Sequence, residues 1–292
     1  MSILITGSTG TIGSALITQL QGQGVEIRAL TRSPAKARFP EGVIPVQGDL
    51  ADVDALRAAL QGVSTLFLLA PNVADELTQA MLALTVAREA GVRGIVYLSV
   101  FKGEEYADVP HFAGKATVER MIAALGLPAS ILRPAYFMQN DLRMKEALLG
   151  PGIYGMPLGS RGVSLVDIRD IAEAAAAELL RRARSPNPLP RETYTLAGPD
   201  ALTGPELAGI WSAALGRGIR YGGDDLAAME QRLKAGLPAW HALDLRLMVG
   251  RYQSDGAVAS AEEIARLTTL LGHAPRGYRA LAEEAAAAWK QG

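Results

Sequence analysis

The 292-residue chain contains no cysteine and only 3 histidines. Without cysteine, disulfide bonds, thiolate nucleophiles and zinc–thiolate sites are all excluded. The histidines (His111, His241 and His273) are far apart in the sequence, so we expect no metal site. No apolar run approaches the length that spans a membrane, and no signal-peptide pattern is present. We therefore expect a cytoplasmic protein without membrane contacts.

The chain also has no excess of charge of one sign. Its 29 basic and 30 acidic residues leave a formal net charge of −1. This balance creates no field that attracts polyanions, so we expect no nucleic-acid partner. Hydrophobic residues make up 49% of the chain and charged residues 20%, which is typical of a globular protein. The length is sufficient for one large domain or two smaller ones.

A strand–loop–helix pattern at residues 3–20 is the most informative feature that is present. An apolar run ends in a loop with Gly7, Gly10 and Gly13, and an amphipathic helix pattern follows at once. Glycines spaced in this way let the backbone approach a pyrophosphate, to which the helix N-terminus offers its N–H groups. A flexible Gly/Ser/Thr turn is the alternative. The residues predicted to bind a dinucleotide here are Gly7, Thr9, Gly10, Thr11, Ile12 and Gly13.

Strand and helix patterns alternate through the first half of the chain. The predicted strands cover residues 3–6, 25–31, 43–47, 65–69, 94–99 and 129–133. The predicted helices cover residues 11–23, a segment capped by Asp52, residues 75–90 and residues 112–124. This alternation predicts an α/β fold with a doubly wound parallel sheet of the Rossmann type, which binds ligands beyond the carboxyl ends of its strands.

The end of the second predicted strand indicates which dinucleotide binds. An acidic residue there would hold the ribose hydroxyls of NAD, but the sequence has Arg32, followed by Lys36. A guanidinium can bind a 2′-phosphate, so these cations favour NADP(H) as the cofactor. The alternative is that both are solvated surface groups. Asp49 and Leu50 follow the third strand, where Asp49 either accepts a hydrogen bond from the adenine amino group or caps a turn.

The regular alternation of predicted strands and helices ends after Pro134. Residues 151–161 are rich in glycine and proline, residues 166–182 form an Ala-rich helix pattern, and a further strand is expected at residues 193–196. Helices are expected around residues 205–215, 225–235 and 261–271. We predict an NADP-binding Rossmann domain over residues 1–150, to which residues 163–182 return, and a smaller, mostly helical substrate or cap domain over residues 151–292.

Six motifs occur in an order that resembles a known family. They are Thr6–Gly13, Thr31-Arg32, Gly48–Leu50, His111–Glu119, Arg133–Asn140 and Val166–Asp170. Together they resemble the NmrA-like branch of the atypical short-chain dehydrogenases/reductases over nearly the whole chain. That family comprises NADPH-dependent reductases of quinones, triphenylmethane dyes and plant phenolics, as well as cofactor-sensing regulators that catalyse nothing.

The resemblance implies that Lys115 lies beside the nicotinamide ribose, where an ammonium can hold the ribose hydroxyls and help relay a proton. The tyrosine that usually stands four residues earlier is replaced by His111. His111 either donates a proton or caps and packs at the helix start. Ser99 ends the fifth strand, where its hydroxyl either meets the nicotinamide or substrate carbonyl or satisfies local backbone groups.

Further candidate contacts with the cofactor and the substrate follow the fourth and sixth predicted strands. The small residues Ala70 and Pro71 would let the backbone lie close to the nicotinamide ribose, and we also expect Tyr136 at the cofactor. Residues after the sixth strand either form an aromatic face for a flat substrate or pack as core between the domains. The candidate substrate contacts are Phe137, Met138, Asn140 and, in a segment that could act as a lid, Tyr154.

These features predict an NADPH-dependent reductase that transfers a hydride to a small planar, electron-poor and aromatic substrate, such as a quinone or dye. Quinone reduction needs little acid catalysis, which suits a site without the usual tyrosine. The alternative is a non-catalytic NADP(H)-sensing regulatory protein that binds a protein partner. The helix faces also allow a homodimer.

Overall fold

The computed structural model describes residues 1–291, which divide into two units. The first unit contains residues 1–103, 111–133 and 168–194, and the second contains residues 104–110, residues 134–167 and the chain from Thr195 onward. Within the described residues, no helix combines the length and the apolar character that crossing a membrane requires.

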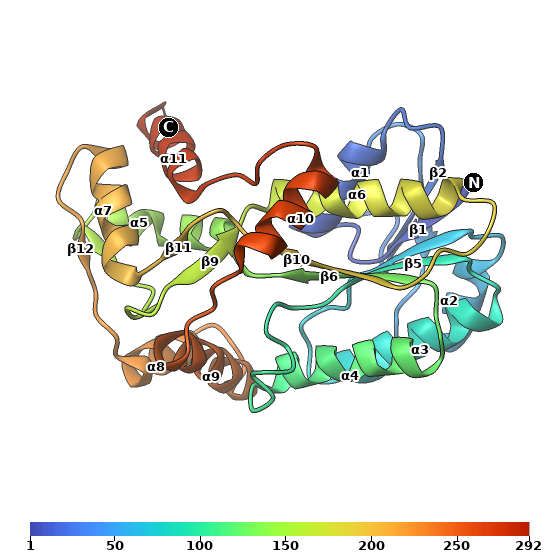
Figure 1. The fold of residues 1–292 in the computed structure, drawn as a ribbon, viewed down its shortest axis with the longest axis horizontal. Coiled ribbons are helices and arrows are strands. Elements are labelled where there is room, and N and C mark those ends of the chain that lie inside the picture. Colours follow the sequence, from blue (N-terminus) through green and yellow to red (C-terminus); the bar gives the residue numbers. More distant parts are fainter. Residues whose placement is uncertain (292) are drawn as a thin grey trace. The chain divides into compact units, whose positions relative to one another are not determined.

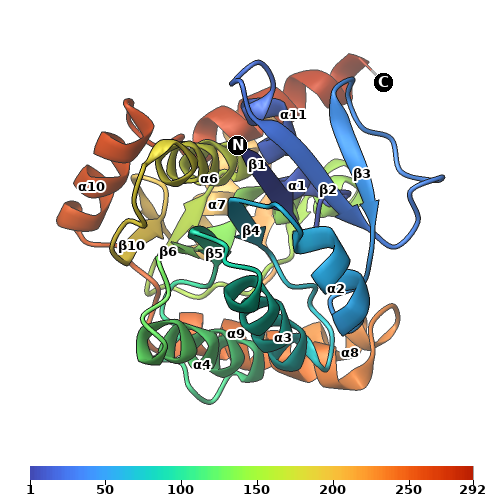
Figure 2. The same ribbon diagram turned by 90° about the vertical axis from the view of Figure 1, so that its right-hand side faces the viewer.

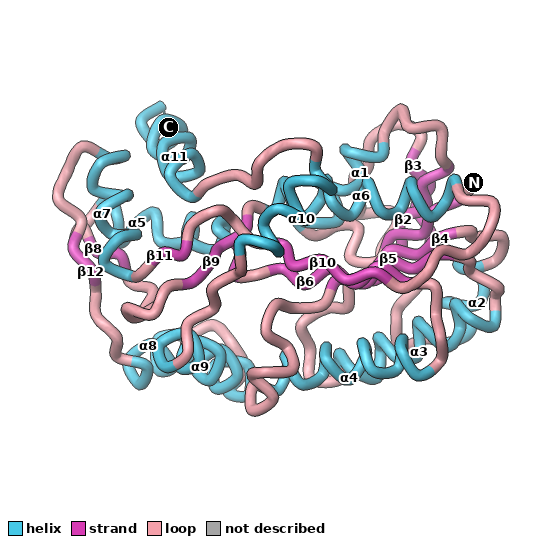
Figure 3. The backbone as a smooth tube through the Cα atoms, in the orientation of Figure 1, coloured by secondary structure: helices cyan, strands magenta, loops and turns pink. Residues whose placement is uncertain are grey.

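A seven-stranded sheet forms the centre of the first unit (Figures 1 and 3). Its order is β10 (Glu192–Leu196), β6 (Ala129–Pro134), β5 (Gly94–Leu98), β4 (Thr65–Leu68), β1 (Ser2–Ile5), β2 (Glu26–Thr31) and β3 (Val43–Gln47). Strands β1 to β6 pair in parallel, and every residue of β1, β4 and β5 is buried. Helices cover both faces, which explains why these strands are mainly apolar.

Two helix layers cover this sheet (Figure 2). On one face lie α1 (Thr11–Leu20) and α6 (Ile168–Arg184), and on the other lie α2 (Val53–Leu60), α3 (Glu76–Glu89) and α4 (Pro110–Ala124). Buried leucines of the sheet, such as Leu4 and Leu66, form one core cluster with Leu84 of α3 and Ile122 of α4. The predicted doubly wound Rossmann-type sheet is confirmed. Strand order reverses between β1 and β4, the point at which such sheets bind ligands.

The second unit is mostly helical and contains two small sheets. Its elements are β7 (Tyr136–Phe137), η1 (Met138–Met144), α5 (Lys145–Leu149), β8 (Ile153–Tyr154), β9 (Val163–Val166), β11 (Ala201–Leu202), α7 (Gly204–Leu215), β12 (Arg220–Tyr221), α8 (Leu226–Lys234), α9 (Ala239–Ser254), α10 (Ala261–Leu271) and α11 (Tyr278–Gln291). The sheets have the orders β11-β9-β7 and β12-β8. Reciprocal capping boxes begin α7 and α10, which accounts for the sharp start of both helices.

The units differ from the predicted domain boundaries at four places. Residues 104–110 and 163–167, which were predicted to belong to the Rossmann domain, group with the second unit. Residues 134–150 group with the second unit because β7 pairs with β9, with Tyr136 opposite Leu165. Residues 183–194 group with the first unit because β10 extends the large sheet. The helix predicted to begin at Val166 begins at Ile168, since residues 163–166 form β9 between two partner strands.

Candidate active site

The glycine loop joins β1 to α1 and contains contacts that only glycine permits. Gly7 has a φ of +61°, in the left-handed region, where other residues are strained. A Cβ atom at Gly13 would lie 2.2 Å from the carbonyl oxygen of Gly7, so the first turn of α1 packs directly on the loop backbone. This arrangement provides the tight turn and close packing that a dinucleotide-binding loop needs.

The N-terminus of α1 is accessible and uncapped. In the part of the chain that the structure describes, no side chain caps α1 at Gly10 and no acidic residue stands in its first turn, whereas Asp52 caps α2. Ile12 and Gly13 are buried. The exposed loop residues are Gly7, Thr9, Gly10 and Thr11. Such a helix end presents free N–H groups and the positive end of the helix dipole, to which a phosphate can bind.

Two buried hydroxyl groups hold the loop in place. Thr6 Oγ1 donates to the Leu69 carbonyl at 2.9 Å and accepts from the Leu69 N–H at 2.8 Å. Ser8 Oγ donates to the Leu30 carbonyl of β2 at 2.7 Å. The loop is therefore tied to the carboxyl ends of β4 and β2, which preorganises it for a ligand.

Two cations after β2 lie on the surface. Arg32 directly follows Thr31, the last residue of β2, and Lys36 lies in the following loop. Both side chains are exposed, and neither forms a salt bridge with any residue within 1–291. An exposed guanidinium with its donors free is suited to bind a phosphate monoester.

Four other predicted cofactor contacts follow β3 and β4, and two of them offer little side-chain surface. Asp49 Oδ1 accepts from the Ala51 N–H at 2.9 Å, which is the turn-capping alternative for this residue. Leu50 and Ala70 belong to the core cluster and are 7% and 4% exposed, so they would meet a cofactor mainly through their backbone. Pro71 is exposed.

Lys115 of α4 is held by two acceptors of the first unit. Its Nζ lies 2.7 Å from Glu76 Oε1 and donates to the Leu98 carbonyl at 3.4 Å. The ammonium also lies over the ring of Tyr97, 6.0 Å from the ring centroid. The side chains of Lys115 and Glu76 are each 13% exposed, so this ion pair is largely withdrawn from water. No sequence motif indicated Glu76, because the residues around it in the sequence form no recognisable pattern.

His111 lies one helical turn before Lys115, so the two side chains share a face of α4. The His111 ring is half-buried and packs edge-to-face on Phe112, with 4.6 Å between ring centroids. This contact agrees with the packing interpretation of His111, and its role as a proton donor stays a prediction.

Tyr97 of β5 is not a replacement for the tyrosine that position 111 lacks. Its side chain is 1% exposed and belongs to the core cluster. Burial raises the pKa of the Tyr97 hydroxyl well above its ordinary value, and the charges of Glu76 and Glu119 raise it further. A hydroxyl so weakly acidic and so inaccessible is a poor proton donor.

Ser99 takes part in a buried polar cluster. Its hydroxyl donates to the carboxylate of Glu119, which also accepts from Arg133 Nη2 at 2.5 Å and Nε at 3.1 Å. Ser99 is 3% exposed and Glu119 is 7% exposed. The cluster ties the end of β5 to α4 and β6. The Ser99 proton is engaged with Glu119 in this arrangement, and its catalytic role stays a prediction.

The predicted substrate contacts all lie in the second unit, together with Tyr136. Tyr136, Phe137 and Asn140 are partly exposed. Met138 is 1% exposed and lies against the position of Gly198, where a Cβ atom would approach the Met138 methyl group within 2.9 Å. This burial favours core packing, the alternative that the sequence left open for Met138.

Asp141 is a buried residue that the motifs did not single out. Its carboxylate accepts from the hydroxyls of Tyr278 at 2.5 Å, Tyr154 at 2.8 Å and Tyr136 at 3.3 Å. The Trp211 indole donates to the Tyr278 oxygen at 2.9 Å. Burial raises the pKa of Asp141 to about 6, although the tyrosine hydroxyls oppose this shift. Tyr154 is therefore a core residue here, and contact with a substrate would require this packing to open.

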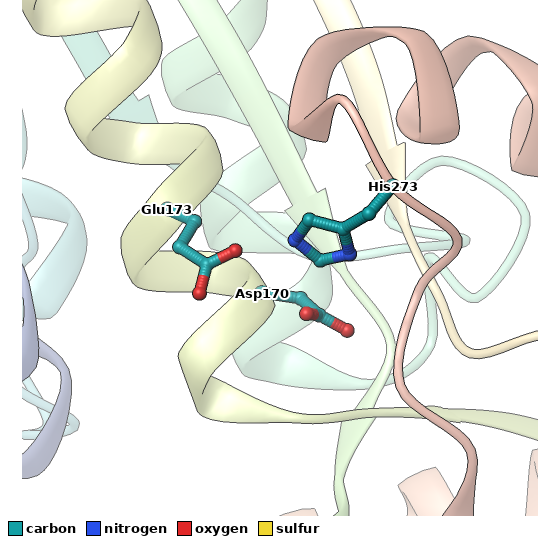
Figure 4. A group of neighbouring side chains, drawn as sticks. All are labelled: Asp170, Glu173 and His273. Atoms are coloured by element: carbon teal, nitrogen blue, oxygen red, sulfur yellow. The ribbon is translucent and has the colours of Figure 1, made fainter.

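Two acidic side chains lie near the start of α6. Figure 4 shows Asp170 and Glu173 on the N-terminal part of α6, and also His273, which belongs to the second unit. A structural zinc centre uses four protein ligands, and the two carboxylates of the first unit do not supply that set. We propose no metal site.

Comparison with known proteins shows the family to which this chain belongs. The model of the NmrA-like family matches residues 1–269. The chain belongs to the NmrA-like family. The resemblance predicted from the motifs is thus confirmed.

Relatives of this NmrA-like protein include reductases that are named for different substrates. It is 35% identical to an NAD(P)H azoreductase of Xenophilus azovorans over 75% of this chain and 76% of that one. It is 31% identical to a (4-alkanoyl-5-oxo-2,5-dihydrofuran-3-yl)methyl phosphate reductase of Streptomyces griseus, over 98% and 99% of the two chains. The NADPH complex of an Escherichia coli NADPH-dependent quinone oxidoreductase is 27% identical, with a TM-score of 0.85 over 97% of this chain and 99% of that chain.

Proposed function

We propose that this NmrA-like protein is an NADPH-dependent reductase that transfers a hydride to a small planar, electron-poor substrate. The observation that carries the proposal is the glycine loop with its accessible, uncapped α1 N-terminus, at the same sheet edge as the exposed Arg32. The relatives described above are named as reductases that use NADPH or NAD(P)H, or as a reductase of a conjugated lactone, and they support this assignment.

The residues of the first unit fit NADP(H). The glycine loop and the N-terminus of α1 would hold the pyrophosphate through backbone N–H groups, and Arg32 with Lys36 would hold the 2′-phosphate. Lys115 would donate a hydrogen bond to the nicotinamide ribose. When bound, the reduced nicotinamide supplies the hydride, so the protein's part is to bind, orient and exclude water.

The substrate class follows from chemistry that the relatives share. An azo group, a quinone and an acyl-substituted unsaturated lactone are all conjugated, electron-poor acceptors. We infer the same class for this protein, with Phe137 and Asn140 as contacts, because both are partly exposed. His111 and Ser99 stay candidates for handling the proton that must accompany the hydride.

The test is NADPH consumption with a panel of quinones, azo dyes and triphenylmethane dyes, with NADH run in parallel. We expect turnover with NADPH, and we expect Lys115→Ala to lower kcat/KM about 10- to 100-fold through loss of one charge-assisted hydrogen bond. Lys234→Ala is the matched control, because Lys234 forms a salt bridge with Glu230 on α8 and belongs to no candidate site. We expect it to leave turnover unchanged.

The same experiment separates the reductase from its alternative. Tight NADPH binding without turnover across the panel would contradict the reductase and favour an NADP(H)-sensing regulatory protein. The replacement of the usual tyrosine by His111 is the feature of this chain that favours that alternative.

A cytoplasmic location and a homodimer complete the proposal. The supporting features are a composition without cysteine and helix faces that leave residues such as Trp240 and Leu243 of α9 exposed. Light scattering coupled to size-exclusion chromatography measures the molar mass in solution. A mass near 30.8 kDa, that of one chain, would contradict the homodimer.

A further inference from the structure

The Lys115 ammonium has three N–H donors, and the first unit engages two of them. One meets the Glu76 carboxylate at 2.7 Å and a second meets the Leu98 carbonyl at 3.4 Å. Within the residues that the structure describes, these are the two acceptors of Nζ. One donor therefore remains for a ligand hydroxyl, at a nitrogen held from two sides.

Glu76 makes the stronger of these two contacts. A hydrogen bond between two charged groups is shorter and about twice as strong as a neutral one, and the Leu98 contact is near the limit of hydrogen-bond length. Because both side chains are only 13% exposed, water competes weakly for the pair. The position of Nζ thus depends mainly on Glu76.

Glu76 reaches Lys115 from a different part of the chain. It is the first residue of α3, after the loop that follows β4, whereas Lys115 lies in the middle of α4. The preceding residue, Asp75, accepts from the Gln79 side chain within α3 at 3.0 Å, but the Glu76 carboxylate is directed to α4. An acidic residue in this first turn also stabilises α3 through the helix dipole. A test must separate that structural effect from positioning.

We propose that Glu76 is the positioning residue for Lys115: its carboxylate holds the ammonium so that the remaining N–H donor is preorganised for the nicotinamide ribose. The inference deepens the proposed function and rests on it. Preorganisation lowers the free-energy cost of binding, so the role of Glu76 appears in cofactor affinity. At saturating NADPH, kcat changes less than the KM for NADPH does.

The experiment is a double-mutant cycle on NADPH affinity by isothermal titration calorimetry, with Glu76→Gln, Lys115→Met and the combination of both. Glu76→Gln keeps the size and removes the charge. We expect it to raise the Kd for NADPH about tenfold in the native background and to have almost no effect in the Lys115→Met background. Glu76→Asp keeps the carboxylate, and we expect it to recover part of the lost affinity.

Glu262→Gln is the matched control, because Glu262 is an exposed acidic residue in the first turn of α10. We expect it to leave the Kd unchanged. Equal effects of Glu76→Gln in both backgrounds would assign Glu76 to the stability of α3 and overturn the proposal. Tighter NADPH binding by Glu76→Gln would also overturn it, since the carboxylate would then compete for Lys115. If the native protein binds no NADPH, the proposed function itself fails, which is a different outcome.

Discussion

The carboxyl group of Asp141 is 1% exposed and surrounded by three tyrosine hydroxyls. Its pKa is raised from an ordinary value of 3.8 to about 6, because burial disfavours the charged form. A folded-state pKa above the unfolded one means that the folded chain binds the proton more tightly. The resulting stability is fully present below about pH 4 and is lost as the pH rises through about 6.

The Asp141→Asn variant tests this linkage. Asparagine does not titrate, so the native protein should lose about 2 kcal/mol more unfolding free energy than the variant between about pH 4 and pH 7. Urea denaturation at both pH values gives the difference. Asp224→Asn is the control, since Asp224 accepts a tyrosine hydroxyl but is exposed. Parallel pH dependence of native protein and Asp141→Asn would contradict the raised pKa.

Gly13 of α1 and Gly209 of α7 are both helical glycines, but they have different surroundings. Gly13 lies in the first turn of α1, where a Cβ atom would lie 2.2 Å from the Gly7 carbonyl oxygen. Gly209 lies inside α7, is exposed, and has no heavy atom of the described structure within 4 Å of an added Cβ atom beyond its own helix backbone. The first glycine shapes the candidate phosphate site, whereas the second only weakens its helix.

Alanine substitutions at these two positions should therefore have opposite effects. We expect Gly13→Ala to displace the loop from α1, to weaken NADPH binding at least about tenfold, and to lower the melting temperature. We expect Gly209→Ala to stabilise the protein by about 0.5–1 kcal/mol with unchanged NADPH affinity, because alanine favours a helix. Calorimetric titration and thermal denaturation measure both. Unchanged NADPH affinity in Gly13→Ala would remove the loop from the cofactor site.

For the whole molecule, cofactor binding and unfolding are linked by mass action. A ligand that binds only the folded state adds about 2.7 kcal/mol of unfolding free energy at one hundred times its Kd. The first unit holds the glycine loop and Arg32, so any unfolding that includes this unit releases the cofactor. A preference for NADPH over NADH therefore changes the melting temperature of the whole chain.

We expect NADPH to raise the melting temperature by several degrees and NADH, at the same concentration, to raise it less. The 2′-phosphate distinguishes the two, so Arg32→Ala should remove most of the difference while the NADH shift remains. Differential scanning calorimetry with each dinucleotide makes the comparison. Arg184→Ala is the control, because Arg184 is an exposed arginine that donates to Gln23, away from the predicted site. Equal shifts in native protein and Arg32→Ala would contradict the role of Arg32.

Elements with a clear local pattern were predicted well. The strand expected at residues 43–47 is β3, and the helix expected after Asp52 is α2, capped by that aspartate through the N–H groups of Asp54 and Ala55. Helices α9 and α11 were not predicted. The residues of α9 form no distinct apolar face. Helix α11 has such a face, but mostly small alanines form it beside Tyr278 and Leu281, and the sequence reasoning missed it. The two-residue strands β8, β11 and β12 are too short to leave a sequence pattern.

Local chemistry explains what the amino-acid sequence revealed about this protein: the glycine loop, the alternating elements, the cations after β2 and, through these motifs, its family. Those features depend on residues within one turn or one strand of each other. The pairing of Lys115 with Glu76 and the tyrosines around Asp141 depend on segments that meet only after folding. Similarly, Arg182 of α6 binds Ser130 of β6 at 2.6 Å and the Pro190 carbonyl at 2.9 Å, which anchors α6 to the large sheet. Burial and hydrogen bonding between distant segments establish such contacts, and no local pattern encodes them.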